Sequence, residues 1–264
     1  MHENSAPVAL VCAMESELVH ALEAIDEQSS FALGPWRAVR GMLAGLPVVA
    51  LAAGIGLVNA AAATSVLIAN ERPRAVFNFG CAGGHHEQIN PGDVIIGAEV
   101  VACGSLITLP DGSERYAGYR YGRGKQTVLT DIIRADRHLL KLARSCADSW
   151  VPKSWPIESP GNREAVIHVG VIASADCWTQ DPRRIGMLHD RHRSLCEEME
   201  AAAVAQVCTV YDVPMLAIKD ISNNELHALT EHGEDGPTLA EVSCELGARS
   251  FALVAEVVSR MNRS

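Results

Sequence analysis

Three carboxylates crowd the point where a short segment leads into an alanine-rich stretch. The run from Cys196 to Ala203 reads CEEMEAAA, and the run from Val213 to Asn223 reads VPMLAIKDISN. The alanines predict a helix after Glu200, and the second run predicts a buried strand that ends in polar residues. Polar residues at the carboxyl end of a buried strand are typical of ligand sites in α/β proteins. The helix dipole alone also favours acidic residues at the start of a helix. These carboxylates could therefore either stabilise the helix start or form a binding site.

The segment from Glu198 to Ala203 resembles the sugar-binding signature of the methylthioadenosine/S-adenosylhomocysteine nucleosidases and of the wider nucleoside phosphorylase superfamily. Further segments are similar to that family in the same order along the chain, and together they are more specific than any single glycine-rich loop. They are AMESE (13–17), GIGLVNAA (54–61), GCAGG (80–84) with PGDV (91–94), and ASADCW (173–178).

The resemblance implies a role for several residues of these motifs. Glu200 would accept hydrogen bonds from the ribose hydroxyls, with Met199 packed under the ribose and Glu198 in the same signature. Glu17 would activate a water molecule, which requires hydrogen-bond reach and a suitable pKa. Trp178 would stack on the purine face. The alternatives are helix-start acids for the two glutamates and a buried structural role for the tryptophan.

The pair Ser222-Asn223 departs from the adenine-directed nucleosidases, which carry Ser-Asp where the acid protonates N7. An amide can donate to N7 or to a 6-oxo oxygen but cannot give a proton away. In this the chain resembles 6-oxopurine nucleoside phosphorylases and futalosine hydrolases. Asp220 is either a displaced acid or a partner of Lys219 or a neighbouring strand end. The segment 223–227 lacks the acidic follow-up of the adenine enzymes, while His227 and His232 are further candidates for ligand contact.

Small residues around the second glycine-rich segment, including Ala82 and Gly83, permit close approach of a ligand to the backbone. Cys81 stands where a phosphate site would use a hydroxyl residue, which favours water over phosphate. The resulting hypothesis is a purine nucleoside N-ribosylhydrolase acting on a 5′-modified, 6-oxopurine nucleoside such as futalosine. The alternatives are a methylthioadenosine/S-adenosylhomocysteine nucleosidase, a phosphate-dependent phosphorylase and a non-catalytic nucleoside-binding protein.

Composition limits the remaining function classes. With 264 residues, 48% of them hydrophobic, the chain is expected to form one domain over residues 1–264. The formal charge of −10 argues against nucleic acid as a partner. Eight scattered cysteines without a CxxC pair predict neither a disulfide framework nor a zinc site, so no metal and no cofactor is expected. The start of the chain has no signal-peptide pattern and no apolar run spans a membrane, which predicts a soluble cytoplasmic protein without membrane partners.

The fold class predicted is a single-domain α/β sandwich with a central, mostly parallel twisted sheet flanked by helices, like the nucleoside phosphorylases. Family resemblance also implies a homodimer or larger homo-oligomer, in which segment 109–112 of a neighbour closes the 5′ pocket. Segments 103–124 and 150–163 are expected to be surface loops. Strands are predicted at 8–12, 48–52, 75–79, 94–101 and 166–172, and helices at 15–24, 59–69 and 239–260.

Overall fold

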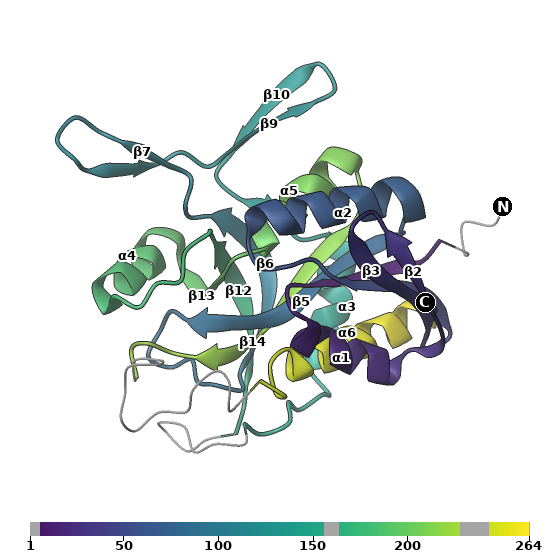
Figure 1. The fold of residues 1–264 in the computed structure, drawn as a ribbon. Helices are drawn as coiled ribbons and strands as arrows, with labels where there is room; N and C mark the ends of the chain where they lie inside the picture. The colour runs from purple at the N-terminus through teal and green to yellow at the C-terminus, as the bar shows by residue number, and fades with distance from the viewer. Residues whose placement is uncertain (1–5, 156–163, 228–242, 264) are drawn as a thin grey trace.

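The structure, a computed structural model, describes residues 6–155, 164–227 and 243–263 (Figure 1). Its helices are α1 (Glu15–Ala24), α2 (Leu57–Glu71), α3 (Arg137–Ala147), α4 (Pro182–His192), α5 (Ala201–Tyr211) and α6 (Ala248–Met261). Its strands are β1 (Val8–Cys12), β2 (Asp26–Leu33), β3 (Trp36–Leu43), β4 (Leu46–Ala52), β5 (Ala75–Gly84), β6 (Val94–Ala102), β7 (Leu106–Thr108), β8 (Glu114–Tyr116), β9 (Tyr119–Arg123), β10 (Gln126–Thr130), β11 (Ile133–Arg134), β12 (Ile167–Ser174), β13 (Ser194–Glu198) and β14 (Met215–Asn223).

The large sheet runs in the order β11-β6-β12-β13-β5-β1-β4-β3-β2, and β14 pairs with both β5 and β6. Strands β5, β14, β6, β12 and β13 therefore close a ring at one end of the sheet. The expected α/β sandwich is confirmed, but the sheet is mixed rather than mostly parallel. Pairs such as β1–β4, β1–β5 and β5–β14 are parallel, whereas β2–β3, β3–β4, β5–β13 and β6–β14 are antiparallel.

Short turns explain much of the antiparallel pairing. The connections at Gly34 and Gly45, with φ of +61° and +80°, are too short for a crossover and reverse the chain between β2, β3 and β4. Sequence analysis missed β2 and β3. Strand β2 is an edge strand with polar and largely exposed residues, so it lacks the apolar run that identifies a buried strand.

Helices cover both faces of the sheet, as Figure 1 shows. Alternate residues of β1 face opposite sides: Ala9 and Val11 pack in a core with α2 and α5, whereas Leu10 packs in a second core with α1, α3 and α6. Both cores consist of buried apolar side chains, which supply the main stabilising free energy of such a fold. The sheet is thereby held between two helical layers, and its strand ends are fixed relative to one another.

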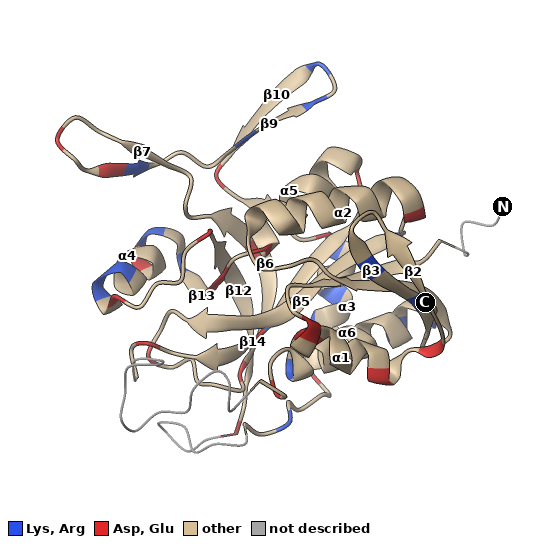
Figure 2. Cartoon of the chain, viewed as in Figure 1, with Lys and Arg blue, Asp and Glu red and all other residues tan. Residues whose placement is uncertain are grey.

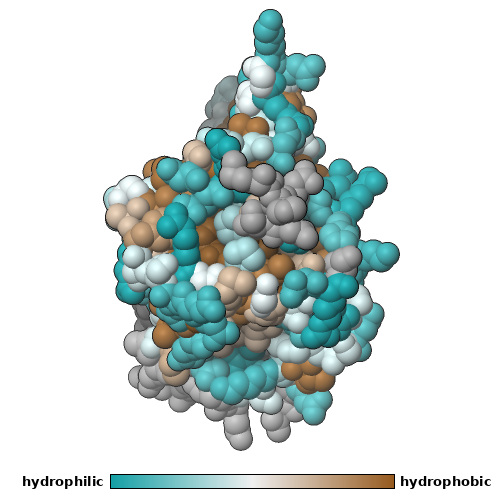
Figure 3. All heavy atoms as spheres, turned by 90° about the vertical axis from the view of Figure 1, so that its right-hand side faces the viewer, coloured by the Kyte–Doolittle hydropathy of each residue, from teal (hydrophilic) through white to brown (hydrophobic). Residues whose placement is uncertain are grey.

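Two segments differ from the expected loops and helix. Residues 103–124 contribute the β7–β8 hairpin and the first strand of the β9–β10 hairpin, rather than irregular loops. Both hairpins extend from the body in Figure 1, and the narrow projection at the top of Figure 3 is mostly hydrophilic. The expected last helix, 239–260, begins only at Ala248, because Gly247 in the left-handed region (φ +78°) ends a preceding turn; residues 239–242 lie outside the described residues. In the part of the chain that the structure describes, no helix is long and apolar enough to cross a membrane.

Candidate active site

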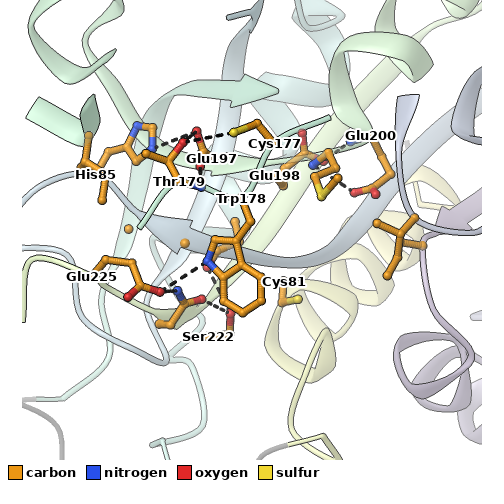
Figure 4. A pocket seen from close by; sticks show the side chains of 18 of the residues that line it. Cys81, His85, Cys177, Trp178, Thr179, Glu197, Glu198, Glu200, Ser222 and Glu225 are labelled. Carbon is orange, nitrogen blue, oxygen red and sulfur yellow. Dashed lines mark hydrogen bonds and ion pairs between the residues drawn. The ribbon is translucent and has the colours of Figure 1, made fainter. Parts of the chain in front are cut away.

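A pocket lies where strands β13, β5 and β14 end side by side (Figure 4). Gly83 on β5 is in register with Glu197 on β13 and with Asn223 on β14. Because Gly83 has no side chain, the space between these two polar residues stays open for a flat ligand. The main residues that the sequence motifs assigned to the site line this pocket: Glu17, Ala82, Gly83, Trp178, Glu198, Met199, Glu200, Ser222 and Asn223.

Glu17 is buried in the first turn of α1 and is held by backbone N–H groups. Its Oε2 accepts from the N–H of Ala13 (2.9 Å) and of Met14 (3.0 Å), and its Oε1 accepts from the N–H of Cys81 (2.9 Å). A Cβ on Gly80, whose φ is +144°, would stand 2.5 Å from Oε1, so this position requires glycine. The carboxylate is thus fixed at the pocket wall, and Oε1 keeps a lone pair that can accept from water.

Glu198 is a structural anchor of the site. Its carboxylate forms a buried ion pair with Lys219 Nζ at 2.8 Å and accepts from the N–H groups of Glu200 and Ala201 at the start of α5. Burial lowers the pKa of Lys219, but the carboxylates of Glu198, Glu200 and Glu17 outweigh burial and raise it. Lys219 therefore stays charged beneath a cluster of acids and compensates part of their mutual repulsion.

Glu200 is the N-cap residue of α5, and its side chain turns toward the start of α2. Oε1 accepts from the N–H of Gly56 at 2.8 Å, which ties the first glycine-rich segment to the acidic run. Burial and the neighbouring Glu198 raise the pKa of Glu200 to about 7, although Lys219 opposes this shift. A carboxylate with that pKa can act as a hydrogen-bond acceptor for a polar ligand and titrates near neutral pH.

Asn223 has its side-chain amide oriented by two neighbours. Ser222 Oγ donates to Oδ1 at 2.8 Å, and Nδ2 donates to Glu225 Oε1 at 2.9 Å. Turning the amide over would place Oδ1 against a carboxylate that only accepts, so this orientation is assigned from its partners. The second N–H of Nδ2 is then a donor that the pocket can offer to a ligand.

Trp178 and Thr179 follow β12 and form another wall of the pocket. Trp178 is 44% exposed, and its Nε1 donates weakly to Glu225 Oε1 at 3.4 Å (Figure 4). Thr179 donates from its backbone N–H to Glu197 Oε1 at 2.7 Å and from its hydroxyl to Oε2 at 3.0 Å. His85 Nε2 lies 3.6 Å from the same Oε2.

The lining of the pocket is strongly acidic. Glu17, Glu197, Glu198, Glu200 and Glu225 line it, and none of the described lining residues is Lys or Arg. Figure 2 shows acidic residues where β13 meets α5, whereas basic residues lie along α4. Within the described ranges, no cluster of three His, Cys, Asp or Glu side chains is arranged to hold a metal ion.

Three sequence-based candidates lie elsewhere. Asp220 does not pair with Lys219, because successive strand residues face opposite sides of the sheet. It is buried against the start of α6, where it accepts from the N–H of Gly247 (3.1 Å) and lies 3.9 Å from Arg249 Nη1. His227 contacts the carbonyl of Glu87 at 2.8 Å and is not among the lining residues. His232 lies outside the described residues.

Sequence reasoning missed four polar pocket residues: His85, Thr179, Glu197 and Glu225. Glu225 belongs to the segment 223–227, which was expected to lack the acidic follow-up of the adenine enzymes, and yet it is 5% exposed and contacts the Asn223 amide. The signal for Glu225 and Glu197 was their closeness in sequence to assigned site residues. Nothing local marks His85, which reaches the pocket only because β5 lies beside β13.

Comparison with known proteins identifies the family of the chain. The family model for the phosphorylase superfamily matches residues 7–259. A 5′-methylthioadenosine/S-adenosylhomocysteine nucleosidase of Bacillus cereus (strain G9842) is 33% identical over 217 residues, covering 82% of this chain and 85% of the relative.

Solved structures show the same fold. The nucleosidase of that name from Neisseria meningitidis, in complex with methylthio-immucillin-A, has a TM-score of 0.74 at 27% identity and covers 97% of this chain and 99% of its own. The native futalosine hydrolase of Helicobacter pylori strain 26695 has a TM-score of 0.72 at 20% identity, covering 98% and 99%, which shows likeness of fold alone. The chain therefore belongs to the phosphorylase superfamily and is related within it to nucleosidases.

Proposed function

We propose that this protein is a nucleosidase that hydrolyses the N-glycosidic bond of a 5′-modified purine nucleoside with a 6-oxopurine base, as in futalosine. The observation that carries the choice of base is the orientation of the Asn223 amide. Ser222 and Glu225 hold it so that it offers the pocket an N–H donor. An N–H donor suits N7 and the 6-oxo oxygen, whereas a 6-amino group would need an acceptor at that point.

Water rather than phosphate is the proposed nucleophile. A phosphate ion needs cationic or N–H donors, and Arg or Lys normally supplies the charge. The described lining offers five carboxylates and no Lys or Arg, and the N–H of Cys81 already donates to Glu17. These groups favour attack by a neutral water molecule over approach of an anion.

In the proposed mechanism Glu17 acts as the general base. Cleavage of the N-glycosidic bond develops positive charge on the sugar, and the surrounding carboxylates stabilise that charge. Glu17 Oε1 accepts a proton from water as the water oxygen bonds to the anomeric carbon. Glu200 accepts hydrogen bonds from the ribose hydroxyls and keeps the anomeric carbon beside that water.

The departing base is received by Asn223 and Trp178. As the bond to the sugar breaks, negative charge accumulates on the purine ring, and the Asn223 N–H stabilises it at N7 or the 6-oxo oxygen without transferring a proton. Trp178 supplies a face on which the purine stacks, worth roughly 1–3 kcal/mol. We further propose a single catalytic domain that acts in the cytoplasm as a homo-oligomer, with the 109–112 turn of a neighbour near the 5′ substituent.

The second candidate is a methylthioadenosine/S-adenosylhomocysteine nucleosidase. Relatives that carry this name, at 33% identity, favour it. It requires a proton for N7 of adenine, and Glu225 is the pocket acid closest to Asn223. Under this candidate Glu225, and not Asn223, would serve as the acid.

One panel of substrates tests both candidates. Inosine, futalosine, adenosine and methylthioadenosine are incubated with catalytic amounts of the protein, with and without phosphate, and free base and sugar are separated by chromatography. The proposal expects faster release of hypoxanthine than of adenine and free sugar in every case. Faster cleavage of methylthioadenosine than of any 6-oxopurine nucleoside would support the second candidate, and sugar 1-phosphate that forms only with phosphate would overturn hydrolysis.

A further inference from the structure

One cluster of polar side chains in the pocket has no role in the proposed mechanism. Glu197, Thr179 and His85 form a cluster (Figure 4), and Glu197 lies on the opposite side of Gly83 from Asn223. Glu197 is 8% exposed and His85 is 2% exposed, so both have left bulk water. Burying a carboxylate and an imidazole beside an otherwise open pocket costs stability unless the groups meet polar partners.

The cluster is built to hold one carboxylate in one place. Thr179 contacts both Glu197 oxygens, through its N–H at 2.7 Å and its hydroxyl at 3.0 Å. The ring of His85 is fixed by Nδ1 against Ser194 Oγ at 2.9 Å, and its Nε2 has no hydrogen-bond partner among the described residues. Because the nearest polar neighbour of Nε2 is Glu197 Oε2, we assign the imidazole proton to Nε2.

These contacts keep Glu197 ionised. Burial alone would raise the pKa of its carboxyl, but His85 and Thr179 outweigh burial and lower it. An ionised carboxylate only accepts hydrogen bonds. The hydrogen bond to Glu197 also occupies the backbone N–H of Thr179. The loop after β12 therefore cannot offer that donor to a base.

A purine bound above Gly83 would meet a different polar group from each of the two strands that flank β5. Asn223 offers a donor on the β14 side, and Glu197 offers an acceptor on the β13 side. Hypoxanthine carries an N–H at N1 next to its 6-oxo oxygen, whereas adenine carries a lone pair at N1. A carboxylate attracts the first and repels the second.

We propose that Glu197, positioned by Thr179 and His85, accepts a hydrogen bond from N1–H of the base and so selects 6-oxopurines. This inference rests on the proposed function and names a recognition residue that the sequence motifs did not assign. Glu197 and Asn223 would then read neighbouring positions of the same base, from the two strands that flank β5.

Glu197→Gln tests the proposal with little change of shape. The N–H of Thr179 keeps the amide oxygen at the Oε1 position, so the NH2 group takes the place of Oε2 and turns an acceptor into a donor. Binding of hypoxanthine, 1-methylhypoxanthine and adenine is measured by calorimetry on the parent and the variant. The parent should favour hypoxanthine over both other bases, and the substitution should reduce each preference by roughly 10- to 100-fold.

Glu225→Gln is the matched control, because it makes the same change at another buried carboxylate of the pocket, the one that accepts from Asn223. It should leave the preference for N1–H over N1-methyl unchanged. Because the methyl group adds the same bulk in every variant, only the change in the ratio reports the hydrogen bond. If Glu197→Gln does not fold, the parent alone decides: equal affinity for hypoxanthine and adenine contradicts a carboxylate at N1.

The outcomes separate the two proposals. A parent that favours 6-oxopurines, with an N1-methyl discrimination that Glu197→Gln leaves intact, overturns the role of Glu197 alone. A parent that cleaves adenine nucleosides faster overturns the proposed function itself.

Discussion

Replacement of Glu17 by Gln tests the assignment of the general base and has a cost that the structure makes calculable. The carboxylate accepts three backbone N–H groups, two at Oε2 and one at Oε1. A glutamine has a single side-chain oxygen. The orientation that preserves two hydrogen bonds places this oxygen near Ala13 and Met14 and turns the NH2 group against the N–H of Cys81.

One buried N–H then loses its acceptor, which costs about 1–3 kcal/mol of unfolding free energy. For a chain of this size each kcal/mol lowers Tm by about 2–4 °C, so we expect a folded variant with Tm lowered by roughly 2–12 °C. The amide cannot take a proton from water, and loss of a general base lowers kcat by roughly 10²- to 10⁴-fold. Stability and turnover should therefore fall together, but turnover far more.

Calorimetric melting and initial rates of base release at saturating substrate measure the two effects. Glu15→Gln is the matched control, since Glu15 lies in the same helical turn, carries the same charge and is exposed. It should leave Tm and kcat nearly unchanged. A Glu17→Gln variant that keeps kcat within about 10-fold of the parent would remove Glu17 from the chemistry, given the 10²- to 10⁴-fold loss expected for a base.

Three further predictions concern Glu200 and Asn223. Glu200→Gln should weaken binding of a ribonucleoside inhibitor by roughly 10- to 100-fold and a 2′-deoxy analogue less, as measured by competitive inhibition; equal losses would show that Glu200 does not touch the ribose. Since the pKa of Glu200 is raised to about 7, its protonation removes the acceptor as pH falls through 7, so inhibitor affinity should drop on the acid side and be flat in Glu200→Gln; a parent profile that is flat as well contradicts this. Asn223→Asp places a second carboxyl 2.9 Å from Glu225, where the pair shares one proton, and should raise kcat/KM for methylthioadenosine relative to inosine by about 10-fold or more; an unchanged ratio would exclude Asn223 from base choice.

The sequence by itself determined the elements with strong local patterns, and it predicted a set of candidate site residues. β1, α1 and β4 were predicted within two residues of their bounds, because buried apolar runs and helical spacing are properties of neighbouring residues. The ordered motifs likewise identified residues that all line one pocket. Polar strands such as β2 have no such local signal.

The tertiary structure decided which side chains meet. Lys219 and Asp220 are adjacent in sequence, yet one pairs with Glu198 and the other with Arg249, because a strand presents successive residues to opposite faces. A register shift between Ile221 and Asn223 changes the pairing of β14 with β5 where the strand reaches the pocket, and bulges of this kind redirect side chains.

The surroundings of Glu197 likewise could not be predicted from the sequence. Glu197 meets His85 only because β13 lies beside β5, and Asn223 lies across Gly83 from Glu197 only because β14 pairs with the other edge of β5. Strand order and register depend on long-range pairing and not on any local pattern. The positions of the Asn223 donor and the Glu197 acceptor on either side of Gly83 are therefore a property of the assembled sheet.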